Sequence, residues 1–542
     1  MMNHNSGTDA DTVRKPVIDI RHLTIALPKS ADRAHAVKDL SFTVHAGETL
    51  CVVGESGSGK SVTSLAIMGL LDTGIRVASG EIRFEGRDIL TLDAASHRGV
   101  VGCRIALIFQ EPMASLNPVY RVGDQIAEVF RIHTDLDRQA VRKRVIDLLG
   151  EVHLPDPQKI YNAYPHQLSG GQCQRVVIAM ALALEPAVLI ADEPTTALDV
   201  TTQAQILHLI RELQQRHRTA VIFITHDFGV VKDIADRIVV MEKGRLVESG
   251  PAEAVLRQPQ EPYTRALLAA VPKLNPRDAR PNSQPLVMEA QRLRKTFHSG
   301  GRRLAALDDV SLTLRRGETI GLVGESGSGK STFARAIIRL VETDSGEIHI
   351  NGQDITRLDG KALRHLRKSV QIVFQDPYSA LDPRQTVGTT IAEGPVIHGM
   401  PAAEAGARAR DLLAAVGLGP DAAMRYPREF SGGQRQRICI ARALALEPDL
   451  LIADESVSAL DVSVQAQVLD LLNRMQEQHG FGMIFITHDL RVASSICDRI
   501  AVMQRGRLVE VAEPSRLFRH PEHKYTARLL RAVPGTTEEV AT

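Results

Sequence analysis

The chain has 542 residues, of which 44% are hydrophobic and 24% charged, and its formal net charge is +1. These values are typical of a soluble globular protein, and the near-zero net charge argues against a protein that binds nucleic acid mainly by electrostatics. The length predicts two large domains or three to four smaller ones. The five cysteines, at positions 51, 103, 173, 439 and 497, are scattered and never form C-x-x-C. The sequence therefore predicts neither a disulfide framework nor a zinc or iron–sulfur cluster, and a reducing compartment fits.

The N-terminal segment has no apolar core of the kind that a signal peptide requires. Residues 1–15 are predicted to be a disordered tail. No apolar stretch reaches the roughly 20 residues needed to span a bilayer. The nearest candidate, residues 176–191, is interrupted by Glu185 and Pro186, and it predicts a buried helix, a turn and a buried strand. We do not expect the chain to cross a membrane by itself.

The nonapeptide VGESGSGKS occurs twice, at 53–61 and at 323–331. Each copy contains G-x-x-x-x-G-K-S between an apolar run and a helix-like segment, a context in which glycine amides and a helix N-terminus cradle phosphate groups. Lys60 and Lys330 are expected to reach the β- and γ-phosphates of a nucleotide, and Ser61 and Ser331 to bind Mg²⁺. An accidental glycine turn is the alternative, and the second copy in the same context counts against it. The predicted nucleotide-binding residues are Gly54, Glu55, Ser56, Gly57, Ser58, Gly59, Lys60, Ser61 and Val62, and Gly324, Glu325, Ser326, Gly327, Ser328, Gly329, Lys330, Ser331 and Thr332.

The repetition extends far beyond the nonapeptide. Residues 36–61 align without a gap to 306–331, and residues 169–200 align to 431–462. A period this long indicates domain duplication rather than a solenoid. The sequence therefore predicts one domain over 16–272, a polar, proline-bearing linker over 273–286, a second domain over 287–535, and a tail over 536–542.

Each repeat alternates short apolar runs with helix patterns. The runs before the ADE and THD segments are apolar throughout, which is typical of parallel strands covered on both faces, so the fold class is predicted to be α/β. A helix-rich stretch (111–186 and 376–448) is expected between the phosphate loop and these strands. The basic tract around 291–304 is interpreted as a solvated hairpin.

Two carboxylates end a buried strand in each repeat. Asp192 and Asp454 are suited to hold Mg²⁺, and Glu193 and Glu455 are suited to polarise an attacking water. An acidic pair at a strand end is often only a solvated turn, but its place beside a phosphate loop favours the functional interpretation.

Two further polar positions recur in the same order. His226 and His488 follow the next buried strand, where an imidazole could contact the γ-phosphate or serve only as a hydrogen-bonded structural residue. Gln110 and Gln375 open the helical stretch and are predicted to contact Mg²⁺ or water. Each residue means little alone, and the repeated order gives both pairs their weight.

A second glycine-rich segment, SGGQ, precedes a long helix pattern in each repeat. Its serine hydroxyl and glycine amides form another possible anion site, although a serine-capped turn is the simpler alternative. Each domain already has a complete phosphate loop, so this segment lacks an obvious ligand of its own. The residues concerned are Ser169, Gly170, Gly171 and Gln172, and Ser431, Gly432, Gly433 and Gln434.

The ordered set GESGSGKS, Gln, SGGQ, ADE, ALD and ITHD resembles the ATP-binding-cassette ATPases over nearly the whole chain, twice. The resemblance implies tandem P-loop ATPase domains, each with a RecA-like α/β core, an antiparallel β subdomain and a helical subdomain. It implies that ATP and Mg²⁺ bind between one phosphate loop and the other repeat's signature segment. Ser431 and Gly433 would then close the first site, Ser169 and Gly171 the second, and Asp199 and Asp461 would communicate between them.

The family usually stacks an aromatic ring on adenine, and here the two repeats differ. Phe297 supplies the ring in the second repeat, whereas the alignment places Leu27 at the same position of the first. We therefore predict weaker nucleotide affinity at the first site, where His35 is a candidate substitute. Ser456 replaces the proline found at Pro194, and Cys173 replaces the arginine found at Arg435, without removing a catalytic group. Both sites are expected to hydrolyse ATP.

The segments EPYTRALLAAVP (261–272) and HPEHKYTARLLRAVP (520–534) resemble the tails of importers of peptides and related solutes, glutathione included. The resemblance implies a peripheral subunit on the cytoplasmic face of the inner membrane, two integral-membrane permease subunits, and a periplasmic or lipid-anchored solute-binding protein. One fused chain would supply both cassettes, and no nucleic acid is expected. A soluble twin-cassette ATPase acting on ribosomes or DNA is the alternative, and a small-molecule P-loop kinase is less favoured because it leaves the paired SGGQ segments unexplained.

Overall fold

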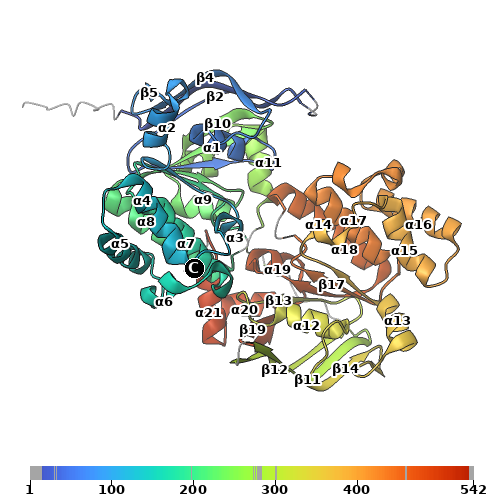
Figure 1. The fold of residues 1–542 in the computed structure, drawn as a ribbon. Coiled ribbons are helices and arrows are strands. Elements are labelled where there is room, and N and C mark those ends of the chain that lie inside the picture. Colours follow the sequence, from blue (N-terminus) through green and yellow to red (C-terminus); the bar gives the residue numbers. More distant parts are fainter. Residues whose placement is uncertain are drawn as a thin grey trace, which may run out of the picture. The chain divides into compact units, whose positions relative to one another are not determined.

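The computed structural model describes residues 15–29, 31, 33–196, 198–272, 274, 276, 283–299, 302–457 and 460–535. Residues 1–14 of the tail predicted over 1–15, the predicted tail over 536–542, and most of the linker predicted over 273–286 lie outside the described residues. The chain forms two compact units, the first comprising Met1–Thr196 and Gln205–Leu268, the second Ala197–Ala204 and Ala269–Thr542. Figure 1 shows that each unit contains both helices and sheets, as the predicted α/β class requires.

A six-stranded sheet forms the centre of the first unit, with strand order β10-β9-β3-β8-β7-β6. Strand β3 pairs in parallel with β8 and β9, and β7 pairs in parallel with β6 and β8. Every residue of β3, β7 and β8 is buried, which explains their unbroken apolar sequences and confirms the predicted parallel strands. The strands are β3 (Thr49–Val53), β6 (Ile105–Ile108), β7 (Val188–Asp192), β8 (Ala220–Ile224), β9 (Arg237–Glu242) and the antiparallel edge strand β10 (Arg245–Pro251).

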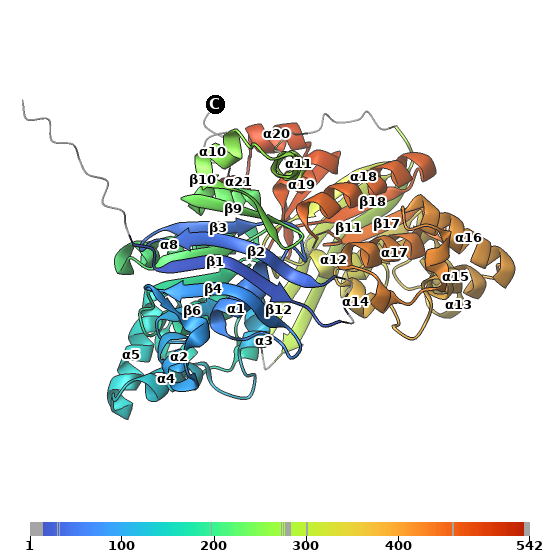
Figure 2. The ribbon, with the colours of Figure 1, turned by 90° about the horizontal axis from the view of Figure 1, so that it is seen from above.

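A second, four-stranded sheet of the first unit has the order β2-β1-β4-β5 and is antiparallel throughout. Its strands β1, β2 and β4 lie side by side in blue in Figure 2. Apolar side chains from this sheet and from the central sheet share one buried cluster. The strands are β1 (Ile18–Ala26), β2 (His35–Val44), β4 (Arg76–Phe84) and β5 (Arg87–Asp88).

Helices of the first repeat follow the predicted pattern. Helix α1 starts within the phosphate loop, and α3 to α7 occupy the stretch that the sequence predicts to be helical. The apolar segment at 176–191 becomes the end of α7, a turn and β7, so the predicted interruption at Glu185 and Pro186 is confirmed. The helices are α1 (Lys60–Met68), α2 (Ala94–Val100), α3 (Pro112–Ser115), α4 (Val122–His133), α5 (Arg138–Glu151), α6 (Pro157–Asn162), α7 (Gly170–Leu182), α8 (Val200–His217), α9 (Phe228–Ile234), α10 (Ala252–Arg257) and α11 (Pro262–Ala270).

The second unit repeats both sheets. Its central sheet has the order β16-β17-β18-β13-β19-β20, and its antiparallel sheet the order β12-β11-β14-β15. The basic tract around 291–304 lies in the antiparallel β11–β12 pair, which confirms the predicted hairpin. The strands are β11 (Leu286–Ser299), β12 (Arg302–Arg315), β13 (Thr319–Val323), β14 (Ser345–Ile350), β15 (Gln353–Asp354), β16 (Val370–Val373), β17 (Leu450–Asp454), β18 (Gly482–Ile486), β19 (Arg499–Gln504) and β20 (Arg507–Ala512).

The helices of the second repeat follow the same order as those of the first. Helix α12 continues the second phosphate loop, and α17 follows the second SGGQ segment. The helices are α12 (Lys330–Ile337), α13 (Gly360–Ser369), α14 (Pro377–Ala380), α15 (Val387–Ile397), α16 (Ala402–Ala415), α17 (Gly432–Leu444), α18 (Val462–His479), α19 (Leu490–Ile496), α20 (Pro514–Arg519) and α21 (Lys524–Arg531).

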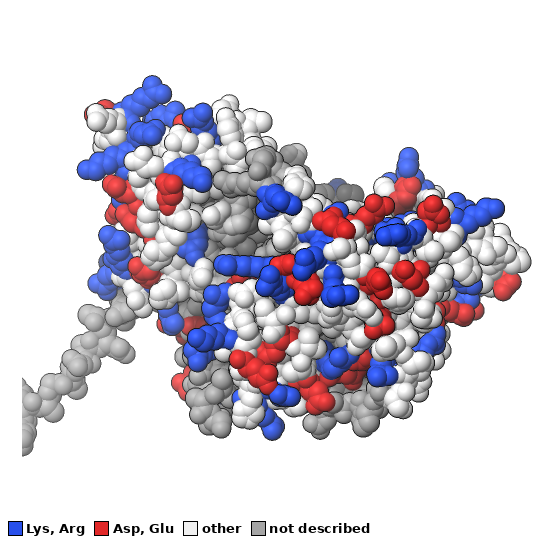
Figure 3. Space-filling view, turned by 90° about the horizontal axis from the view of Figure 1, so that it is seen from below, with Lys and Arg blue, Asp and Glu red and all other residues white. Residues whose placement is uncertain are grey.

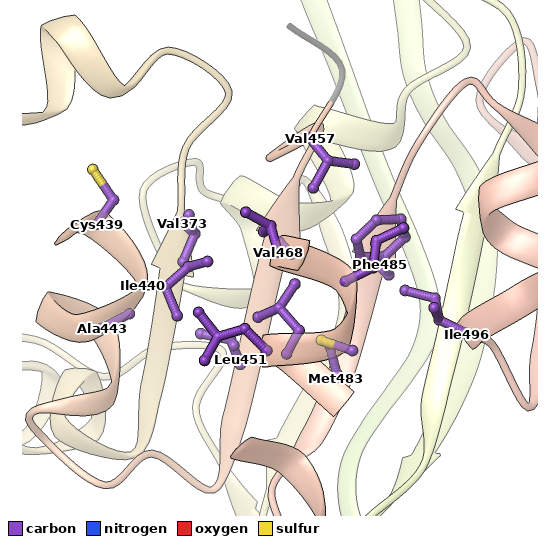
Figure 4. Close-up of a cluster of buried hydrophobic side chains, with 14 of the residues drawn as sticks. Val373, Cys439, Ile440, Ala443, Leu451, Val457, Val468, Met483, Phe485 and Ile496 are labelled. Carbon is purple, nitrogen blue, oxygen red and sulfur yellow. The ribbon is translucent and has the colours of Figure 1, made fainter. Parts of the chain in front are cut away.

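One face of the second central sheet packs against helices through a large apolar cluster. Figure 4 shows Leu451 of β17 and Phe485 of β18 beside Ile440 of α17 and Val468 of α18. Burial of this apolar surface, worth roughly 25 cal/mol per Å², fixes the strands against the helices. The cluster thereby sets the position of the strand ends that carry the polar residues described below.

Acidic and basic side chains are interspersed over the face drawn in Figure 3, in keeping with the net charge of +1. Within the described ranges, the model contains no helix with the length and apolar character needed to span a bilayer.

Candidate nucleotide-binding sites

The phosphate loops adopt a conformation that requires glycine. Gly54 has φ 148° and Gly59 has φ 101°. A Cβ atom at Gly54 would lie 2.2 Å from the carbonyl oxygen of Met241, and one at Gly59 would lie 2.8 Å from that of Ala36. The second loop repeats this geometry, since a Cβ at Gly324 would lie 2.1 Å from a backbone oxygen. Backbone approaches this close exclude any side chain at these positions.

The loop lysines are buried and held by backbone carbonyls. Lys60 Nζ donates to the carbonyl oxygens of Gly54 and Glu55 at 2.7 and 2.8 Å. Lys330 Nζ donates to those of Gly324 and Glu325 at 2.8 and 3.0 Å. Burial lowers the pKa of Lys330, whereas nearby carboxylates, Glu455 first among them, oppose the shift. Each ammonium group is thus fixed at the mouth of its loop.

The strand-end aspartates contact the serines that follow the loop lysines. Ser61 Oγ donates to Asp192 Oδ1 at 3.1 Å, and Ser331 Oγ donates to Asp454 Oδ1 at 3.3 Å. Burial raises the pKa of each aspartate, and the charge of the adjacent glutamate raises it further. A divalent cation at this place would relieve both effects.

The donor set fits Mg²⁺ only with help from a ligand. A hydroxyl and a carboxylate are oxygen ligands of the kind that Mg²⁺ prefers, and proteins commonly complete its shell with substrate phosphates and water. Among the described residues there is no group of three or more histidine, cysteine, aspartate or glutamate side chains able to hold a metal ion. The phosphates of a bound nucleotide would therefore supply part of the coordination.

Glu193 is surrounded by three polar side chains. Gln110 Nε2 donates to its Oε2 at 2.8 Å, and Thr196 Oγ1 donates to the same oxygen at 3.0 Å. His226 Nδ1 lies 3.1 Å from its Oε1. Burial alone would raise the pKa of Glu193, but the hydrogen bonds and charge of His226, with Thr196, bring that pKa below its ordinary value. The carboxylate is therefore held ionised, as a base that accepts hydrogen bonds from water must be.

Glu455 also contacts a glutamine, and its histidine is more distant than that of Glu193. Gln375 Nε2 donates to Glu455 Oε2 at 2.8 Å, and His488 Nδ1 lies 3.9 Å from that oxygen. Burial opposes ionisation of both groups, but their interaction lowers the pKa of Glu455 and raises the pKa of His488. The structure thus brings each predicted glutamine, glutamate and histidine together.

The SGGQ segments cap the helices that follow them. Ser169 Oγ accepts from the N–H of Gln172, whose side chain accepts from the N–H of Ser169, and Ser431 and Gln434 form the same capping box. The simpler of the two alternatives, a serine-capped turn, is therefore correct as local structure. Ideal Cβ atoms at Gly170 and Gly432 would meet nothing within 4 Å. Open space on the helix N-termini is compatible with an approaching anion, which stays a prediction.

Phe297 lines a pocket of the second unit together with the second phosphate loop. The pocket has a volume of about 350 Å³. Leu27, at the corresponding position of the first repeat, packs instead against the apolar cluster of the first unit. The pocket is lined by Leu198, Asp199, Phe297, Leu304, Ala306, Ser326, Gly327, Gly329, Lys330, Ser331, Thr332, Gln375, Glu455 and His488.

The second unit also contains the segment Ala197–Ala204, which carries the first ALD aspartate. Asp199 accepts hydrogen bonds from Thr201 and Thr202, and these bonds hold its pKa below the ordinary value although burial opposes the shift. Thr201 Oγ1 also lies 2.9 Å from Glu325 Oε1 in the second loop. Asp461, the second ALD aspartate, is the N-cap residue of α18.

Sequence reasoning missed three contacts to the phosphate loops. Arg33 donates to the carbonyl oxygen of Gly57 at 2.6 Å. The hydroxyl of Tyr263 accepts from the N–H of Glu55 at 3.3 Å, and that of Tyr525 accepts from the N–H of Glu325 at 3.0 Å. Both tyrosines lie in the tail segments, and their matching positions in the two tails were the available signal.

Comparisons with known proteins match both repeats. The ABC transporter family model matches residues 37–196 and 307–458, and a model of the oligopeptide/dipeptide transporter C-terminal region matches 247–299 and 509–541. The glutathione import ATP-binding protein GsiA of Escherichia coli O157:H7 is 49% identical, with 98% of this chain and 91% of that protein covered. The protein of the same name from Pectobacterium atrosepticum is 47% identical, with 96% and 90% covered. A dimeric, ADP- and phosphate-bound structure of the ATP-binding cassette MJ0796 is 30% identical, covers 42% of this chain and 98% of its own, and has a TM-score of 0.40.

Proposed function

Because the chain belongs to the ABC transporter family and carries the oligopeptide/dipeptide transporter C-terminal region in both repeats, we propose that it is the ATP-hydrolysing subunit of a bacterial peptide importer. The observation that carries this proposal is the repeated cluster of loop lysine, strand-end carboxylates, glutamine and histidine in a family that binds ATP. The same C-terminal region counts against the alternative of a factor acting on ribosomes or DNA.

The residues of each site have distinct roles in hydrolysis. The loop amides and Lys60 or Lys330 bind the phosphates and stabilise negative charge on the transferring group. Glu193 or Glu455, held ionised, orients and polarises the attacking water. The neighbouring glutamine and histidine position that carboxylate, and the histidine registers the γ-phosphate. Ser61, Gln110 and Asp192, and likewise Ser331, Gln375 and Asp454, would hold Mg²⁺, which neutralises phosphate charge when bound.

Two nucleotides would drive a cycle of closing and opening. In this proposal Ser431 and Gly433 complete the site of Lys60, and Ser169 and Gly171 complete that of Lys330. ATP then links two opposed anion-binding surfaces, and hydrolysis removes the γ-phosphate contacts and weakens that link. Asp199 and Asp461 would communicate between the two sites.

The partners follow from the importer role. Two membrane-embedded permease subunits would convert the cycle into alternating access, and a periplasmic or lipid-anchored solute-binding protein would deliver the solute. The chain would act at the cytoplasmic face of the inner membrane. The similarity to glutathione import proteins favours glutathione or another short peptide as the solute.

Purification of the tagged chain from native membranes tests this proposal. We expect permease subunits and a solute-binding protein to co-purify, and reconstituted vesicles to accumulate a short peptide only with ATP. The matched control is the Glu193→Gln, Glu455→Gln double variant, which should assemble but not transport. Release of no phosphate by the assembled complex, or purification with ribosomes instead of membrane proteins, would overturn the proposal.

A further inference from the structure

The tail helix of each repeat contacts the phosphate loop of the same repeat through one tyrosine. The N–H of Glu55 donates to the Tyr263 hydroxyl of α11 at 3.3 Å, and the N–H of Glu325 donates to the Tyr525 hydroxyl of α21 at 3.0 Å. The partners are 208 and 200 residues apart in sequence. The same long-range contact between tail and phosphate loop therefore forms in both repeats.

The contacted peptide group also holds the loop lysine, because its carbonyl oxygen, that of Gly54 or Gly324, accepts from the lysine Nζ at 2.7 or 2.8 Å. The carbonyl oxygen of Glu55 accepts from Lys60 Nζ at 2.8 Å, and that of Glu325 accepts from Lys330 Nζ at 3.0 Å. One residue of each loop is therefore bonded on its N–H side to the tail and on its carbonyl side to the phosphate-binding ammonium group. A shift of the tyrosine would move the peptide against which the lysine is placed.

The tail helix is itself anchored to the central sheet, so the tyrosine is not free to drift. Glu248 of β10 accepts from the N–H groups of Gln260 and Glu261, which directly precede α11, at 2.8 and 3.3 Å. Glu510 of β20 accepts from those of Glu522 and His523 before α21, at 3.0 and 3.1 Å.

In each unit these contacts form a closed series that joins the loop, the tail helix and the central sheet. Strand β3 leads into the first loop, the loop contacts α11, α11 is bonded to β10, and β10 pairs with β9, the neighbour of β3. The second unit forms the same series through β13, α21, β20 and β19. This set of contacts restrains the shape of each loop.

A second tail contact exists only in the second repeat. Arg528 of α21 donates to Glu325 Oε1 at 3.0 Å, whereas Ala266 occupies the aligned position of α11. The Arg528 side chain is 61% exposed, and an ion pair that is this accessible to solvent contributes little. Tyr525, in contrast, is buried, with burial raising the pKa of its hydroxyl to about 12. In the second repeat the hydroxyl contact is therefore the stronger of the two, and it is the contact that both repeats share.

We propose that Tyr263 and Tyr525 are positioning residues that hold each phosphate loop in its nucleotide-binding shape and couple the peptide-transporter tail to nucleotide occupancy. This inference rests on the proposed assignment of the loops as ATP sites. Since the loop contacts nucleotide throughout the reaction, loss of the hydroxyl should weaken binding of ATP and of the transition state alike. Affinity should fall while kcat changes little.

The test measures each loop separately in the full chain. Lys330→Ala leaves the first loop intact and Lys60→Ala leaves the second, so binding of a slowly hydrolysed ATP analogue to these parents reports one site at a time. We expect Tyr263→Phe to raise Kd about threefold to tenfold in the Lys330→Ala parent, the effect of losing one hydrogen bond. Tyr525→Phe should leave Kd unchanged in that parent, and the pattern should reverse in the Lys60→Ala parent.

Tyr161→Phe is the matched control, because Tyr161 is a buried tyrosine of α6 outside both loops, and its loss of a hydroxyl should not alter Kd. Hydrogen exchange supplies a second measurement. By reciprocity, the analogue should slow exchange of the α21 amides in the Lys60→Ala parent and slow it less after Tyr525→Phe.

Unchanged Kd values in both tyrosine variants, or equal effects of each variant on both loops, would overturn this inference and leave the proposed function standing. Failure of both single-lysine parents to bind the analogue, with the unaltered chain also failing to bind it, would overturn the proposed function and this inference together.

Discussion

Gln110 and Glu193, 83 residues apart in sequence, are joined by a hydrogen bond of 2.8 Å from Nε2 to Oε2. Gln110 lies in the segment between β6 and α3, and Glu193 directly follows the buried strand β7 of the central sheet. Gln375 and Glu455 repeat the contact at the same distance. Each candidate base is thus held by a side chain whose own position depends on the helical stretch.

The first prediction concerns these glutamates. Glu193→Gln and Glu455→Gln each remove an ionised carboxylate and keep the side-chain shape, so each should lower ATP hydrolysis at its own site about 100-fold or more. Because both sites are expected to turn over, either single variant should reduce total phosphate release, measured by steady-state assay. ATP binding should persist.

Glu253→Gln is the control for the glutamate variants, because Glu253 is an exposed residue of α10. Its turnover should match that of the unaltered chain. Full turnover in either the Glu193→Gln or the Glu455→Gln variant would contradict the assignment of that glutamate.

A second prediction follows from the unequal adenine positions. Phe297 lines the pocket of the second unit, whereas Leu27 is half-buried and packs against the apolar cluster of the first unit. Stacking of a base on an aromatic ring is worth about 1–3 kcal/mol, so the Lys330→Ala variant should bind ATP about tenfold more weakly than the Lys60→Ala variant. Isothermal titration measures both affinities.

Two exchanges separate the ring from other differences between the sites. Leu27→Phe in the Lys330→Ala background should tighten binding, and Phe297→Leu in the Lys60→Ala background should weaken it. Equal affinities in the two parents would contradict the prediction of weaker nucleotide binding at the first site.

The third prediction concerns the apolar cluster of Figure 4. Phe485 is 0% exposed and lies among side chains of the sheet and the helices that cover it. Phe485→Ala should destabilise the second unit by about 3–5 kcal/mol, the sum of lost transfer energy and an unfilled cavity. Thermal unfolding should show a lower midpoint for that unit, whereas Met424→Ala, at a residue that is 79% exposed, should leave it unchanged. An unchanged midpoint for Phe485→Ala would mean that the cluster does not bear on stability.

The fourth prediction uses the pKa shifts of His488 and Glu455. The raised pKa of His488 means that its stabilisation is fully present below the ordinary value of 6.5 and is lost as pH rises through the higher folded value. The lowered pKa of Glu455 means that its stabilisation is present above 4.5 and is lost as pH falls through the lower folded value. The pair should therefore stabilise the second unit most between pH 4.5 and 6.5.

Calorimetry on the unaltered chain and on Glu455→Gln measures this dependence. The difference in unfolding midpoint between them should be larger at pH 5.5 than at pH 9, because the charge of His488 is lost as pH rises through its raised pKa. A difference that stays constant or grows toward pH 9 would contradict the raised pKa of His488.

Much of the fold could be predicted because each local pattern matches its surroundings. The unbroken apolar sequence of β7 reflects burial on both faces, and the Gly54 to Ser61 spacing reflects a loop that tolerates no side chain at Gly54. The cap at Ser169 could likewise be predicted, because serine is a preferred N-cap residue and a helix pattern follows it.

The features of the fold and of the sites that could not be predicted depend on contacts between distant parts of the chain. The order β10-β9-β3-β8-β7-β6 does not follow the order of the strands in sequence. The contact between Glu55 and Tyr263 forms because the tail segment packs beside the phosphate loop, 208 residues away in sequence. Local sequence periodicity does not predict a contact over this separation. Cys173 of the first repeat stands where the second repeat has Arg435, and one hydrogen bond is common to both. Cys173 Sγ donates to the carbonyl oxygen of Pro165, and Arg435 Nε donates to that of Pro427.

The duplication within one polypeptide has a genetic consequence. In an assembly of identical subunits, a mutation that changes one catalytic pocket changes its twin as well. Here Leu27 can diverge while Phe297 is retained, and Ala266 can diverge while Arg528 is retained. Tandem fusion thus lets selection act on each half separately, so the two halves are able to acquire unequal duties within a single inherited gene product.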